Sequence, residues 1–72
     1  MKTTKKGAIQ IVSYLKEKVT EFETGRKYWE SKYNNSNIED VKKEAHRNVM
    51  HFMSTINELQ SMILQLTLDY KL

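Results

Sequence analysis

The chain has 72 residues and a formal net charge of +3, and it contains no cysteine and no proline. The absence of cysteine excludes a disulfide framework and a thiolate metal site, and a chain this short is near the lower limit for burying an adequate core alone. With two glycines and no proline, the composition permits long helices and argues against an all-β fold. We therefore expect one small all-α domain, and the cysteine-free composition favours a cytoplasmic protein.

The first residues have the basic character of a signal peptide, with lysines at positions 2, 5 and 6. The apolar run that follows is interrupted by Gln10 and Ser13, and no small-residue cleavage site comes after it. No stretch approaches the length needed to span a membrane. A membrane surface is disfavoured as a partner, because the polar face of this segment also carries Glu17 and Glu21 and its apolar face has a better use in the bundle.

The first predicted helix covers about residues 4–33. Its apolar positions follow alternating steps of three and four, which places them on one side of a helix; they are Ala8, Val12, Leu15, Val19, Phe22, Trp29 and Tyr33. Gly25 interrupts this segment and should cost about 1 kcal/mol relative to alanine in a helix interior. We expect the helix to continue through it, because Trp29 and Tyr33 keep the spacing set by Phe22.

The predicted turn covers residues 34–36, and the second helix covers about residues 37–70. Ser36 followed by Glu39 has the spacing of a capping box, with Ser36 as the N-cap. The helix then carries its own apolar stripe at the same spacing, with members Ile38, Ala45, Val49, Phe52, Ile56, Leu59, Ile63, Leu66 and Tyr70. Two such helices joined by a short turn form a two-helix antiparallel hairpin.

The two stripes match one another when the chain is folded at this turn. Facing residues should then have numbers that add to about 71, which pairs Leu15 with Ile56. The same register places Val19 opposite Phe52, and it places Trp29 beside Lys42 as a candidate cation–π pair.

A hairpin has one internal seam, and this chain has more apolar side chains than one seam can bury. An uncovered apolar patch of this kind marks an interface, and a symmetric homo-oligomer is the commonest way to cover it. We expect the hairpin to dimerise into a four-helix bundle. The predicted oligomer interface comprises Ala8, Ile9, Ile11, Val12, Leu15, Val49, Met50, Phe52, Met53, Ile56, Leu59, Met62, Ile63 and Leu66.

The residue types that carry catalysis or bind metals do not form a recognisable pattern. His46 and His51 diverge by about 140° on a helix, so they cannot jointly hold one metal ion. The carboxylates alternate with lysines, as on a solvated helix face, and there is no glycine-rich phosphate loop and no nucleophile elbow. The sequence therefore predicts a protein that is not an enzyme and takes no cofactor or metal.

Basic and aromatic side chains gather in the first helix. Residues 1–36 carry eight Lys or Arg against four Glu, whereas residues 37–72 carry four against five Asp or Glu. Aromatic rings interleaved with cations can stack on bases and bind phosphates, or they can form a protein hot spot. The candidate contacts to nucleic acid or to a protein partner are Lys16, Lys18, Arg26, Lys27, Tyr28, Trp29 and Lys32.

Two families of helical hairpins are similar to this layout. The Rop family of small RNA-binding hairpins dimerises into four-helix bundles, and the similarity is one of architecture, with no residue motif to carry over. The triplet Trp29-Glu30-Ser31 resembles that of the WXG-type secreted hairpin proteins, with Ser31 where those proteins have glycine. The favoured function is a non-enzymatic protein–protein interaction module, such as a small adaptor, inhibitor or regulatory subunit. A Rop-like nucleic-acid binder and a WXG-type protein are the alternatives.

Overall fold

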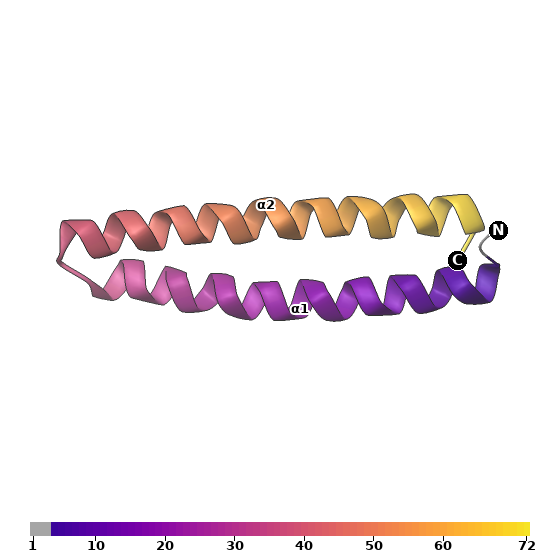
Figure 1. The fold of residues 1–72 in the computed structure, drawn as a ribbon, viewed down its shortest axis with the longest axis horizontal. Coiled ribbons are helices and arrows are strands. Elements are labelled where there is room, and N and C mark those ends of the chain that lie inside the picture. The colour runs from indigo at the N-terminus through magenta and orange to yellow at the C-terminus, as the bar shows by residue number, and fades with distance from the viewer. Residues whose placement is uncertain (1–3) are drawn as a thin grey trace.

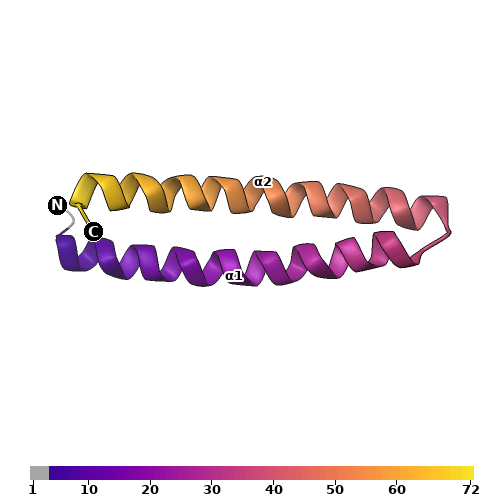
Figure 2. The ribbon, with the colours of Figure 1, turned by 180° about the vertical axis from the view of Figure 1, so that it is seen from behind.

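The protein is an all-α antiparallel hairpin in a computed structural model that describes residues 4–72. Helix α1 runs from Lys5 to Asn35 and helix α2 from Glu39 to Tyr70, with the three residues 36–38 between them. The two helices lie side by side along their whole length, and α1 starts at the end of the molecule where α2 finishes (Figure 1). Seen from the front and from behind, neither broad face of the hairpin is covered by another element (Figure 1 and Figure 2). The molecule extends 51 × 18 × 14 Å.

Each helix begins in a different way. Thr4 caps α1, and its hydroxyl accepts a hydrogen bond from the Gly7 N–H at 3.0 Å, which satisfies one of the free donors of the first turn. The capping box predicted for α2 was wrong, because the helix begins at Glu39 and its N-cap is Ile38, which makes no side-chain cap. Ser36 instead follows α1 in an extended conformation, and its hydroxyl accepts the Ile38 N–H at 3.1 Å within the turn.

Because the turn is centred on residue 37 and not on residue 35, the facing register also differs from the prediction. Facing residue numbers add to about 74, so the ring of Phe22 packs against the ring of Phe52 with centroids 5.8 Å apart. The predicted contact of Lys42 with Trp29 was wrong for the same reason, since the Lys42 ammonium lies 4.9 Å from the centroid of the Tyr33 ring. The shift of about one turn preserves the alignment of the two stripes, because apolar residues recur at every turn.

Gly25 lies inside an unbroken α1, as predicted. Its place is explained by the facing helix, since a Cβ atom at this position would stand 2.9 Å from Cζ of Phe52 and 3.0 Å from Cε1. The glycine therefore makes room for the ring of Phe52, which also packs against Phe22 on α1. The cost in helix propensity is offset by this closer packing of the two helices.

The core is small and lies mainly in the half of the hairpin away from the turn, with Ala45 as a further buried residue nearer the turn. Within residues 4–72, the apolar residues that count as buried are Ala8, Val12, Leu15, Ala45 and Ile56. Toward the turn, Tyr33 and Ile38 were predicted to extend the seam, but they are 39% and 64% exposed. Ile38 is outside the helix in the extended turn, so its side chain does not continue the stripe.

Candidate functional site

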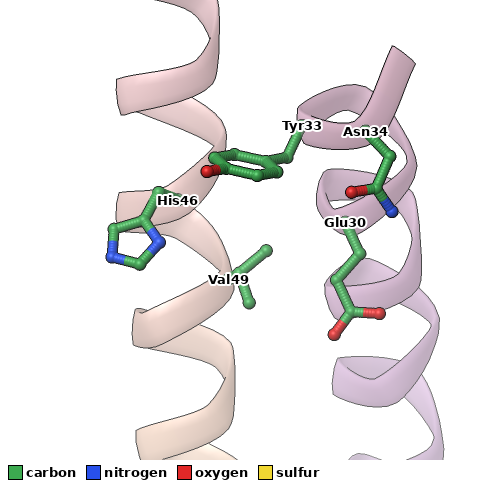
Figure 3. A pocket seen from close by; sticks show the side chains of 5 residues that line it. All are labelled: Glu30, Tyr33, Asn34, His46 and Val49. Carbon is green, nitrogen blue, oxygen red and sulfur yellow. The ribbon is translucent and has the colours of Figure 1, made fainter. Parts of the chain in front are cut away.

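Polar side chains line a shallow cleft of about 250 Å³ close to the turn. Figure 3 shows the Tyr33 ring reaching from α1 across to α2, with Glu30 and Asn34 on the α1 side and His46 and Val49 on the α2 side. The centroids of the Tyr33 and His46 rings are 6.2 Å apart. The Glu30 carboxylate accepts a hydrogen bond from the Arg26 guanidinium at 3.0 Å, so it is already neutralised within α1. The cleft thus offers two neighbouring rings tilted by 48° and one paired carboxylate.

The predicted interface residues divide into three groups according to their burial. Ala8, Val12, Leu15 and Ile56 are buried inside the hairpin, so they hold its two helices together and present little surface to another molecule. Five more are half-buried, namely Val49, Phe52, Leu59, Ile63 and Leu66. The remaining five are exposed large apolar side chains, namely Ile9, Ile11, Met50, Met53 and Met62.

Four of the five exposed large apolar residues of α2 form a second stripe, about a third of a turn away from the seam, whereas Met62 points to the opposite side of the hairpin. Met50, Met53, Leu64 and Leu68 are 53%, 41%, 59% and 65% exposed. Asn57 and Ser61 are exposed and fall in the same direction between them. We call these six residues the α2 stripe; they lie within about 80° of one another at 3.6 residues per turn.

Sequence reasoning noticed the apolar surplus but missed Asn57 and Ser61 as members of the same stripe. Their helical spacing is visible in the sequence, since the intervals from Met53 to Asn57, to Ser61 and to Leu64 are four, four and three residues. Because both residues are polar, a pattern of apolar positions alone does not assign them to the stripe.

Ile9 of α1 lies on the same side of the hairpin as the α2 stripe. The cleft near the turn identifies this side, because Glu30 of α1 and His46 of α2 both line it. Leu64 is eighteen residues, or about five full turns, after His46, so the two side chains share a direction. Ile9 lies within about 60° of the direction of Glu30. The side chain of Ile9 therefore extends the apolar surface from α2 onto α1.

The α2 stripe belongs to a helical segment that is almost free of charge. From Asn48 to Leu68, Glu58 is the single charged residue. A solvated helix face normally carries many more, because charged side chains are the ones that prefer water. Within residues 4–72, the structure has no helix that is both long and apolar enough to cross a membrane.

The opposite side of the hairpin also carries exposed apolar side chains. Ile11 and Tyr14 point away from Ile9 on α1, and they are 41% and 57% exposed. The Lys18 ammonium lies 5.3 Å from the centroid of the Tyr14 ring and 3.2 Å from the Glu21 carboxylate. The hydrogen bond to Glu21 raises the pKa of Lys18 above its usual range. This side therefore mixes apolar and charged groups.

The predicted basic and aromatic contacts are divided between separate directions of α1. Tyr28, Trp29 and Lys32 come together: the two rings are 5.3 Å apart at their centroids, and the Lys32 ammonium lies 5.2 Å and 5.4 Å from them. Arg26 is half-buried and paired with Glu30.

The remaining predicted cations stand apart from this cluster. Lys16 and Lys18 point about 160° apart, and Lys27 and Lys32 point about 140° apart. These lysines therefore fall in two opposite directions, Lys16 with Lys27 and Lys18 with Lys32, and do not form one basic face.

The histidines are also separate. His46 lies against Tyr33, while the ring of His51 lies 6.0 Å from that of Phe52. Across the described part of the chain, no three His, Cys, Asp or Glu side chains are grouped so that they could hold a metal ion. Comparison with protein-family models, with curated proteins and with solved structures found no match to this chain.

Proposed function

We propose that this hairpin is a non-enzymatic protein–protein interaction module that acts as a homodimeric helical bundle. The observation that carries the proposal is the α2 stripe, a row of exposed apolar side chains on a segment with one charge in 21 residues. The row is apolar at both ends, with Asn57 and Ser61 in its middle, and exposed large apolar side chains gathered on one face are typical of an interface. The composition without cysteine favours the cytoplasm as its location.

The surface area of the chain supports the same conclusion. A compact monomer of 8.6 kDa exposes about 4,700 Å² by the scaling that folded monomers follow, whereas this chain exposes 5751 Å². The difference, about 1,000 Å², is comparable to the roughly 800 Å² that each partner buries in a standard interface. A second copy would thus bury about as much surface as the hairpin exposes in excess of a compact monomer.

The arrangement of the cations favours a protein partner over a nucleic acid. A nucleic-acid interface needs a basic face that follows the phosphate backbone. On α1 the cations point in opposite directions, and both Lys18 and Arg26 are paired with carboxylates of their own helix. The Rop-like alternative predicts binding to RNA or duplex DNA at low salt that is lost steeply as salt rises.

The test is the solution mass of the protein over a concentration series, measured by light scattering after size exclusion. We expect a dimer, and we expect Leu64→Lys to shift the protein toward the monomer by placing a charge in the interface. Tyr28→Lys is the matched control, because Tyr28 is 54% exposed and Leu64 is 59% exposed, but Tyr28 lies outside the stripe. Helix content by circular dichroism checks that both variants fold. A wild-type protein that stays monomeric at micromolar to millimolar concentration would contradict the proposal.

A further inference from the structure

The α2 stripe has a pattern that suits contact with its own copy in the reverse direction. Resting on the homodimer proposed above, we propose that the two copies pack α2 against α2 in antiparallel orientation, about a two-fold axis at the level of Leu59. The contacting residues then have numbers that add to about 118. Met50 meets Leu68 of the second copy, and Met53 meets Leu64.

The centre of this contact is polar and self-complementary. Asn57 of each copy meets Ser61 of the other, twice by symmetry, close to the axis. The Asn57 amide can donate and accept, and so can the Ser61 hydroxyl, so each pair can form a hydrogen bond. A polar layer in an otherwise apolar seam penalises shifted registers, because a shift leaves polar groups against apolar ones.

The charges near the turn decide against a parallel contact. Continued toward the turn at the same spacing, the stripe passes through His46, Lys43 and Glu39. A parallel dimer in register would place Lys43 on Lys43 and Glu39 on Glu39, and such like-charge pairs oppose association.

The antiparallel contact avoids these pairs because the two hairpins overlap only in their open halves. The overlap from Met50 to Leu68 is 18 residues, or about 27 Å at 1.5 Å per residue. It coincides with the segment from Asn48 to Leu68, in which Glu58 is the single charge. The charged turn halves then project from the two ends of the assembly.

Such a dimer keeps the turn end of each hairpin free. Tyr28, Trp29 and Lys32 are near the turn, beyond the overlap, and each copy presents this aromatic and basic cluster at an opposite end. The dimer is therefore elongated, with a turn end of one copy at each end and the contact between the copies in its middle.

Disulfide cross-linking of the full chain tests the orientation, since the natural sequence contains no cysteine. The two variants are Met53→Cys and Leu64→Cys, each made with a different affinity tag, oxidised alone and as an equal mixture. In the antiparallel dimer the thiol introduced at position 53 of one copy would face the thiol introduced at position 64 of the other. Two thiols at position 53 would instead lie about 18 Å apart along the axis. A disulfide needs Cα atoms within about 7 Å.

We expect the mixture to yield a covalent dimer carrying both tags, at about tenfold or greater excess over either variant oxidised alone, because only that pair meets the distance limit. Ser31→Cys is the control: this residue is exposed on α1 near the turn, outside the overlap, and it measures random collision. Light scattering on the reduced variants reports their mass separately. Efficient cross-linking of the Met53→Cys variant to itself would overturn the antiparallel contact and leave the proposed function standing. A wild-type protein that is monomeric would overturn both.

Discussion

Gly25→Ala is the substitution whose outcome depends most directly on the packing of the two helices. Alanine in place of glycine in a helix interior should stabilise the helix by about 1 kcal/mol. Against this, the new Cβ would stand 2.9, 3.0 and 3.3 Å from three atoms of the Phe52 ring. Forcing a methyl group into a packed site costs about 1–3 kcal/mol. The ring would have to shift to accept this methyl group, and Phe22 and His51 lie beside it at centroid distances of 5.8 and 6.0 Å.

The cost of the clash with Phe52 should exceed the gain in helix propensity. We therefore expect Gly25→Ala to lower the free energy of unfolding by about 1 kcal/mol. In a Phe52→Leu background the aromatic ring is gone, and the same substitution should raise the free energy of unfolding by about 1 kcal/mol. The coupling between the two sites would then be about 2 kcal/mol in a double-mutant cycle.

The assay is urea denaturation followed by far-ultraviolet circular dichroism, with all four proteins at one concentration because the stability of an oligomer depends on it. If Gly25→Ala stabilises the protein equally in both backgrounds, the coupling is zero. The contact with Phe52 would then not be the reason for the glycine.

Three further predictions concern the stability of the hairpin. Thr4→Ala removes the hydroxyl that accepts the Gly7 N–H and should cost about 1 kcal/mol, with faster amide exchange confined to the first turn of α1. Leu15→Ala should cost about 3 kcal/mol in denaturant unfolding, because Leu15 is 6% exposed and lies at the centre of the small core; a loss under half of that would mean that the seam is loosely packed. Arg26→Gln breaks the 3.0 Å pair with Glu30 and should cost at most about 0.5 kcal/mol, an effect that added salt should abolish in the same titration.

The candidate surface was predicted in part. The surplus of large apolar side chains could be read from the sequence because a hairpin of this length has room for one buried stripe, and the exposure of Ile9, Met50 and Met53 agrees with it. The same prediction also included Val12 and Leu15, which are buried between the helices. Residues of one stripe look alike in sequence whether they face the partner helix or another molecule, and only packing distinguishes the two.

The sequence by itself determined that the protein is a helical hairpin. Two runs of apolar residues at helical spacing, no proline and a polar break between them leave no other compact arrangement, because a helix can bury its apolar side only against another helix here. The continuity of α1 through Gly25 followed from the unbroken spacing of Phe22 and Trp29.

Only the tertiary structure decided how the two helices are aligned. Whether the turn is centred on residue 35 or 37 changes no apolar pattern, since a shift of one turn again places apolar residues opposite apolar ones. The conformation of Ser36 and the fit of Phe52 beside Gly25 selected the observed register. Local spacing sets which side of a helix is buried, whereas side-chain shapes across the seam set which residues meet.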